Sequence, residues 1–284
     1  IARYEWNGTS PMPMLKAPGY VKNSIQSSEN EVVGGSDLRR LGYPEGEIIT
    51  RKNLTTYRQK GWKTFEYEAA VNFSNTKTGS EGCFTITSHY TDKPNVTPAG
   101  EMVKKAIKTS FDEGAAPHKK WWQQYWEQSV VSIPDPLLEK QYYLEMYKFG
   151  AASRKGAPPI TLQAVWTADN GKLPPWKGDL HNDLNTQLSY WPSYTGNHPE
   201  EGAVFTDWMW KHKLDFEHYA KKVFGADGLN VPGVATLTGA PMGGWHMYSL
   251  SPTVGAWLAQ HFYLQWKYTM DREFLTNQAY PWFS

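Results

Sequence analysis

The hydrophobic pattern of this 284-residue chain changes its period near Pro98. Before that point, residues 64–73 and 83–90 alternate apolar and polar side chains, which predicts antiparallel strands with one face exposed to water. After it, apolar residues recur at helical spacing, as Val103 and Ile107 do. We therefore predict a multidomain β + α chain, in which a β domain is followed by a helical one.

The same signals set the expected boundaries. Residues 1–96 show no sustained helical period and are punctuated by Gly and Pro, which predicts a partial β-sandwich. Residues 97–130 predict a helical linker, in which Trp122 and Trp126 lie four apart and share a face. We expect these rings to pin the linker by packing, although a platform for a sugar is compatible with the same spacing. Residues 131–284 predict the helical domain.

Long decorated loops separate the expected helices of the last domain. Loops are expected at 155–182 and 226–250, with helices at 185–194, 197–225 and 251–268. This order is typical of a helical toroid, whose loops gather at one end and form a pocket. A helix beginning at residue 136 is expected to bury an apolar stripe made of Leu138, Tyr142, Met146 and Phe149.

Composition excludes several classes of protein. A net charge of +1 with scattered basic residues argues against binding to nucleic acid or an anionic membrane. Cys83, the single cysteine, excludes an internal disulfide framework and is expected as a buried thiol within a strand. No apolar run has the length of a membrane span, and no phosphate-binding or Gly-x-Ser-x-Gly motif is present. Because the chain starts Ile-Ala-Arg and ends inside an expected element, we expect it to be a segment of a longer protein.

One polar stretch, residues 176–192, stands out in the helical part. It interleaves acids, amides, a histidine and a glutamine with tryptophan and tyrosine rings. Aromatic faces stack on the apolar faces of sugars, and sugar hydroxyls need nearby donors and acceptors. The stretch therefore predicts a carbohydrate site, with a surface loop followed by an ordinary helix as the alternative. The predicted pocket residues are Trp166, Trp176, His181, Gln187, Trp191, Trp245 and His246.

Asp183 and Asn185 are the candidate catalytic residues within this stretch. Together with Asp179 and His181 they alternate, so an extended segment would project all four to one side. Breaking a glycosidic bond needs two carboxyl groups. Asp183 is the candidate base or substrate-binding carboxylate, and Asn185 could orient a water or a hydroxyl. Alternatively, Asp183 caps the helix that follows.

Metal and cofactor signals are weak. Asp179, His181 and Asp183 could ligate a cation in principle, but no His-Glu-x-x-His or paired-cysteine spacing supports this, and we predict no metal and no cofactor. The Gly-Gly-Trp-His run at 243–246 would let a backbone approach a ligand with Trp245 stacked on its ring, or would simply form a tight turn around a packed tryptophan.

The order and spacing of several motifs resemble glycoside hydrolase family 95, the inverting α-L-fucosidases and related α-L-galactosidases. The matching motifs are Trp-Trp at 121–122, Ile-Pro-Asp-Pro at 133–136, Leu-Gln-Ala-Val-Trp at 162–166, Pro-Trp-Lys-Gly-Asp-Leu-His at 175–181, Tyr-Trp-Pro at 190–192 and Ser-Pro-Thr-Val-Gly-Ala-Trp-Leu-Ala-Gln-His at 251–261.

The resemblance implies a β-sandwich, a helical linker and the first part of an (α/α)6 barrel. In the family, an Asn-x-Asn pair before the Tyr-Trp helps a distant carboxylate to activate water. The matching positions here are Asp183 and Asn185, so the first amide is replaced by an acid. The family's general acid and its activating aspartate would lie beyond Ser284. The resemblance also implies a secreted or periplasmic bacterial protein.

Two functions follow as hypotheses. The first is an inverting glycosidase that releases a terminal fucose-like or galactose-like sugar from an oligosaccharide or plant glycan. The second is a non-hydrolytic glycan-binding protein or a polysaccharide lyase on a helical toroid. Both have carbohydrate as the partner, with no nucleic acid and no membrane insertion. The sequence leaves the sugar, the linkage and the oligomeric state open.

Overall fold

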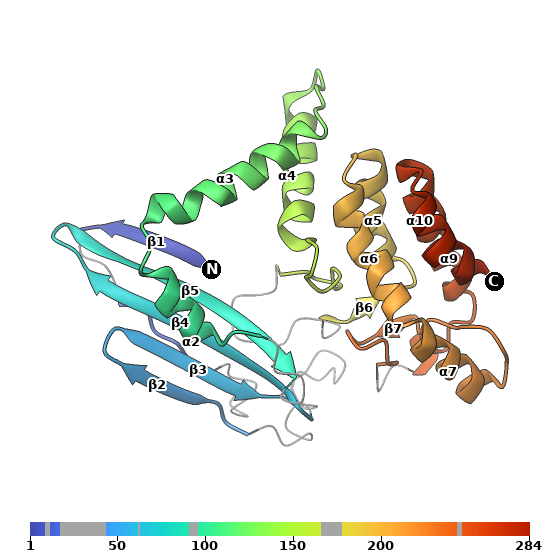
Figure 1. The fold of residues 1–284 in the computed structure, drawn as a ribbon, viewed down its shortest axis with the longest axis horizontal. Helices are drawn as coiled ribbons and strands as arrows, with labels where there is room; N and C mark the ends of the chain where they lie inside the picture. The colour runs from blue at the N-terminus through green and yellow to red at the C-terminus, as the bar shows by residue number, and fades with distance from the viewer. Residues whose placement is uncertain (9–11, 18–43, 62, 91–95, 166–177, 243–245) are drawn as a thin grey trace. The chain divides into compact units, whose positions relative to one another are not determined.

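The computed structural model describes residues 1–8, 12–17, 44–61, 63–90, 96–165, 178–242 and 246–284 (Figure 1). These residues form two compact units that divide between Trp121 and Trp122. The first unit contains an antiparallel sheet and the second is mostly helical. A β part followed by a helical part agrees with the prediction.

The first unit is built on a sheet of five strands among the described residues, in the order β1-β5-β4-β3-β2. The two alternating runs are the adjacent strands β4 and β5, and Val71 is opposite Phe84 in their register. The predicted strands are therefore confirmed, while the second sheet of a sandwich stays a prediction. The strands are β1 (Ala2–Asn7), β2 (Glu47–Arg51), β3 (Leu54–Lys60), β4 (Phe65–Asn75) and β5 (Gly79–Tyr90).

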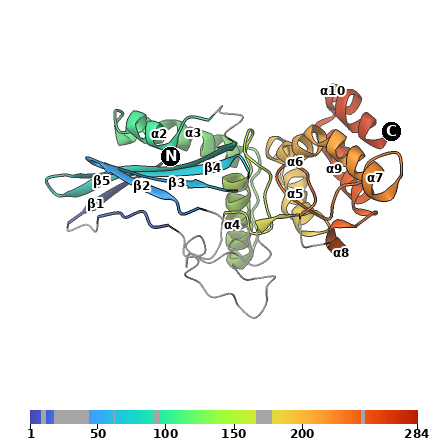
Figure 2. The same ribbon diagram turned by 90° about the horizontal axis from the view of Figure 1, so that it is seen from below.

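Helix α2 (Ala99–Ala106) covers one face of this sheet (Figure 2). Val103 packs against Ala70 and Cys83 in the core below the helix. Glu68 fixes the start of the helix, because its carboxylate accepts a hydrogen bond of 2.7 Å from the Gly100 N–H. Cys83 is 2% exposed, so the expectation of a buried thiol is confirmed, and this burial raises the pKa of the thiol.

The helical unit is organised around α5, α6 and α9, which pack against one another. Tyr190 of α5 stacks on Phe205 of α6 with ring centroids 4.8 Å apart, and both are fully buried. The elements of this unit are the second part of α3 (Phe111–Glu127), α4 (Pro136–Ala152), β6 (Leu180–His181), α5 (Asn185–Thr195), α6 (Pro199–Lys211), α7 (Lys213–Phe224), β7 (Val234–Ala235), α8 (His246–Ser249), α9 (Val254–Thr269), α10 (Arg272–Phe274), the π-helical turn η2 (Leu275–Ala279) and α11 (Tyr280–Phe283).

The aromatic residues of the linker pack among themselves and against α4. Trp122 stacks on Trp126 at 5.7 Å between centroids and on Tyr147 at 5.0 Å, and Arg154 lies over the Trp122 ring. The shared face of Trp122 and Trp126 is confirmed. Its role is packing, because these contacts occupy the ring faces that a sugar would need.

Three helix predictions need correction. Leu138 is 57% exposed, so the buried stripe of α4 begins later than expected, with Met146 and Phe149 fully buried. Asn197 does not cap α6: its φ is +58° and its side chain donates to the Gln128 carbonyl, while His198 holds the cap position. The single helix expected at 197–225 is two, because the chain changes direction at His212 between α6 and α7. None of the described helices has the length and apolar character that a membrane crossing requires.

Candidate functional site

The polar stretch forms a short strand, a turn and the start of a helix. Leu180 and His181 pair with Ala235 and Val234 of β7. The Asn182 N–H then donates to the Gly233 carbonyl at 2.7 Å, and the chain turns before α5 begins. The predicted alternation therefore ends at His181, and Asp183 and Asn185 do not continue an extended segment. The interpretation that all four polar residues project from one side of a strand was wrong.

Asp179 and His181 form a buried pair at the start of the site. His181 Nδ1 lies 3.0 Å from Oδ2 and 3.2 Å from Oδ1 of Asp179. The hydrogen bond that His181 Nδ1 donates to Asp179 raises the pKa of His181; burial opposes this rise, and the charges of Asp179 and Asp183 add to it. The Asp179 carboxylate thus fixes the orientation of the imidazole, whose ring centroid is 6.2 Å from that of Tyr248.

Asp183 and Asn185 lie at the accessible surface of the turn. Asp183 is partly exposed, and its Oδ1 accepts the Leu184 N–H at 2.8 Å. Leu184 itself holds the N-cap position of α5, without a side-chain hydrogen bond, so the capping alternative for Asp183 was wrong. Asn185 is exposed in the first turn of the helix. Both candidate catalytic side chains are therefore open to a ligand.

Gln187 and Trp191 lie on α5, below the turn. The Gln187 side chain is fully buried, and its amide nitrogen donates to the backbone carbonyls of Asn182 at 3.1 Å and Asp183 at 2.9 Å. Trp191 is partly buried. Gln187 was predicted to line the pocket, and the structure places it beneath the chain that carries Asp183.

Three of the four remaining pocket predictions are not placed. Trp166, Trp176 and Trp245 lie outside the described residues. His246 is the first residue of α8. The other predicted site residues lie on a single segment, from Asp179 to Trp191, in which Asp179 contacts His181 and Gln187 contacts the backbone of Asp183.

Asn182 is a site residue that sequence reasoning overlooked. Its side chain is fully buried, and its amide nitrogen donates to the Pro232 carbonyl at 3.0 Å. The signal was an amide directly before Asp183, but its partner lies fifty residues further along the chain. Within the described ranges, no three His, Cys, Asp or Glu side chains come close enough to hold a metal ion.

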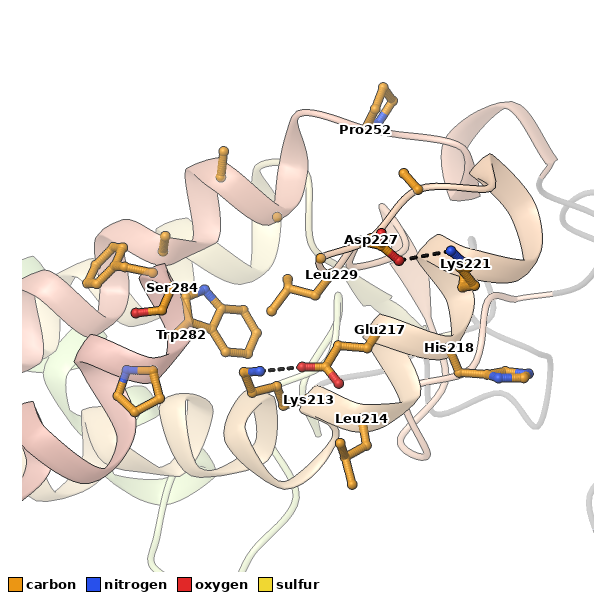
Figure 3. A pocket seen from close by; sticks show the side chains of 17 residues that line it. Lys213, Leu214, Glu217, His218, Lys221, Asp227, Leu229, Pro252, Trp282 and Ser284 are labelled. Atoms are coloured by element: carbon orange, nitrogen blue, oxygen red, sulfur yellow. Dashed lines mark hydrogen bonds and ion pairs between the residues drawn. The ribbon is translucent and has the colours of Figure 1, made fainter.

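A cavity of about 1040 Å³ lies elsewhere in the helical unit, between α7, the start of α9 and α11 (Figure 3). It is lined by the ion pairs Lys213–Glu217 and Lys221–Asp227, and by none of the predicted site residues. Trp282 is buried at its wall, and Phe262 is stacked 4.5 Å from it. Because the Trp282 ring is buried and packed against Phe262, it is not available to stack on a sugar. We therefore place the candidate site at the polar turn.

Comparison with known proteins identifies the family of the chain. The model of the glycosyl hydrolase family 95 catalytic domain matches residues 100–284, and the chain belongs to this family. Alpha-L-fucosidase 2 of Arabidopsis thaliana is 33% identical over 156 residues, which cover 54% of this chain and 18% of that protein. Probable alpha-fucosidase A of Aspergillus niger is 23% identical over 216 residues, covering 64% of this chain and 26% of that protein. The matches thus span 18% and 26% of the lengths of these two relatives.

A solved structure shares the fold. A putative kojibiose phosphorylase from the human microbiome superposes with a TM-score of 0.60 at 14% sequence identity. The match covers 84% of this chain and 35% of that chain. At this identity the likeness concerns the fold alone.

Proposed function

We propose that the protein is a glycoside hydrolase that releases a terminal fucose-like or galactose-like sugar from an oligosaccharide or plant glycan. The observation that carries the proposal is the family match over residues 100–284, which includes the polar turn with its accessible Asp183. The names of the two relatives, both fucosidases, support a fucose-like sugar.

The proposed reaction inverts the anomeric carbon. One carboxylic acid protonates the leaving oxygen while a base activates water on the opposite face, and the two groups are about 6.5–9.5 Å apart to admit that water. Asp183 acts near this water as the base or as a carboxylate that binds the sugar, and Asn185 orients the water or a hydroxyl. His181 and Trp191, together with Trp166, Trp176, Trp245 and His246, form the surrounding pocket.

The proposal extends to the protein's architecture and location. The helices of the second unit would be the first part of an (α/α)6 barrel, with residues 97–130 as linker, and the sheet would belong to a β-sandwich. A secreted or periplasmic location would suit an enzyme that acts on polymeric glycans.

The test is a sugar-release assay on the full-length protein, with fucosylated and galactosylated glycans, in parallel with Asp183→Asn. We expect the parent to release a monosaccharide whose first-formed anomer, followed by NMR, is inverted, and the variant to lose turnover. The matched control is Asp227→Asn, since Asp227 is an exposed aspartate with one ion pair, and it should keep full activity. Release with retained configuration would reject inversion, and undiminished turnover in Asp183→Asn would reject the role of Asp183.

A further inference from the structure

The turn that carries Asp183 is held from two sides by buried amides. On one side, Asn182 binds the neighbouring loop through its own N–H to Gly233 and through its side-chain amide to Pro232. On the other side, the Gln187 amide donates to the carbonyls of Asn182 and Asp183 at 3.1 and 2.9 Å. Both side chains are fully buried, so solvent does not replace these hydrogen bonds when one is lost.

We propose that Gln187 is a positioning residue, which fixes the backbone of Asp183 and so the direction of its carboxylate towards the reacting water. This inference rests on the proposed function, because it needs a working carboxylate at Asp183. It changes the role predicted for Gln187, from contact with the sugar to control of a neighbour's geometry.

The geometry explains why the side chain must be an amide. Two successive carbonyls, of Asn182 and Asp183, point at the same nitrogen, and each needs a donor. A single NH₂ group supplies two donors, whereas a carboxylate would place further acceptors opposite both oxygens. A reacting carboxylate must be held to within about 0.5 Å, and the supporting shell of buried hydrogen bonds provides that precision.

The chain supplies a matched control in the same unit. Gln265 of α9 is also a buried glutamine, and its amide nitrogen donates to a backbone carbonyl, that of Pro199, at 3.0 Å. Replacing it removes a comparable hydrogen bond at the start of α6, away from the turn of Asp183. Gln265→Leu therefore reports the effect of losing a buried amide in general.

The experiment compares the parent with Gln187→Leu, Gln187→Glu and Gln265→Leu in the full-length protein. Three quantities are measured: the melting temperature, kcat and KM on a substrate the parent cleaves, and hydrogen exchange of the peptides covering residues 181–187. We expect both Gln187 variants to lower kcat by about tenfold to a hundredfold, which is the effect of misplacing a reacting group by about 1 Å, with KM changed far less. Exchange should accelerate in residues 181–187, whereas Gln265→Leu should lose stability but keep kcat.

The outcomes separate the inference from the function it rests on. A parent that releases no sugar overturns the proposed function and the inference together. An active parent with an inactive Asp183→Asn, but with normal kcat in Gln187→Leu, overturns the inference alone. Equal losses of kcat in Gln187→Leu and Gln265→Leu would show a general effect of stability and would likewise overturn it.

Discussion

The Asp179 carboxylate accepts a hydrogen bond of 3.0 Å from His181 Nδ1. Asp179 directly precedes the two-residue strand β6, and His181 is the last residue of that strand. Both side chains are largely withdrawn from solvent, and Asp183 adds a second negative charge near the ring. The surrounding β7 residues, Val234 and Ala235, are buried and apolar. The imidazole is therefore stabilised as a cation, and its pKa is raised mainly by Asp179.

This pair predicts a pH-dependent loss of stability in Asp179→Asn. A raised pKa in the folded state means that the stabilisation is complete below the unfolded pKa of about 6.5 and is lost as pH rises through the folded value. Urea denaturation at pH 5.5 and pH 8.5 should show a larger deficit for the variant at the lower pH. A deficit that is the same at both pH values would show that Asp179 acts by packing alone.

Two other histidines predict acid lability of the helical unit. Burial lowers the pKa of His198 and of His261 to about 4. Because the unfolded state binds more protons between about pH 6.5 and pH 4, stability should fall in this interval by about 1 kcal/mol per pH unit for each histidine. His261→Gln should flatten the pH dependence of the melting temperature below pH 6.5.

The surroundings of the two imidazole rings support the lowered pKa values. The ring of His198 stacks on Tyr125 at 3.9 Å between centroids, and the nearest carboxylate, that of Glu201, is 3.8 Å from Nδ1, too far for a hydrogen bond. Burial raises the pKa of Glu201, which favours a neutral pair. His261 Nδ1 lies 2.9 Å from the hydroxyl of Tyr194, which carries no charge at these pH values. If the melting temperature of His261→Gln fell with pH below 6.5 as steeply as that of the parent, the lowered pKa of His261 would be contradicted.

Tyr190→Phe should destabilise the protein by about 1–3 kcal/mol, the cost of leaving a buried donor without a partner. The Tyr190 hydroxyl accepts the Ile160 N–H at 2.8 Å inside the core, and burial raises the pKa of Tyr190 to about 12. The control is Tyr143→Phe: its hydroxyl also bonds backbone, at Val131, but the side chain is partly exposed and water can substitute. Equal losses in urea denaturation would contradict the role of burial.

Local patterns were sufficient to predict the elements that depend on neighbours in sequence. The alternation of 64–73 and 83–90 predicts β4 and β5 but not which face is covered, because Phe84 is 48% and Ile86 68% exposed whereas Glu66 is 1% exposed. The helix expected at 185–194 is α5, at Asn185–Thr195, because its polar start and apolar face lie within one segment. Periodicity carries this information because burial acts on every second residue of a strand and about every fourth of a helix.

The site was predicted less well, because its geometry depends on contacts far along the chain. Asp183 leaves the extended path since Asn182 binds Pro232 and Gly233, and no local signal announces a two-residue pairing of β6 with β7. Asn197 has the sequence of a cap but donates to Gln128 instead. Residue types identified the polar turn as a candidate, while tertiary contacts decided which of its side chains are accessible and which are buried.

The close approach of α5 and α6 gives the last prediction, for Gly202→Ala. A Cβ at Gly202 would lie 2.5 Å from Ser193 Oγ and 2.9 Å from Ser193 Cβ, so the two helices would have to separate. Overpacking of this kind costs about 1–3 kcal/mol, which exceeds the gain in helix propensity of up to about 1 kcal/mol. The control is Gly255→Ala in α9, where the added Cβ would meet nothing closer than the Val231 nitrogen at 3.5 Å, an ordinary van der Waals contact; this variant should be neutral or slightly stabilising.

A double-mutant cycle decides whether Ser193 is the cause. Ser193→Gly removes both atoms that the new Cβ would meet, although it also removes the bond from Ser193 Oγ to the Tyr190 carbonyl and weakens the helix. We expect Gly202→Ala combined with Ser193→Gly to be less destabilised than the sum of the two single variants, measured by urea denaturation. Strict additivity would mean that the cost of the methyl group added in Gly202→Ala arises elsewhere, and the contact between α5 and α6 would then not set the position of the helix that carries Asn185.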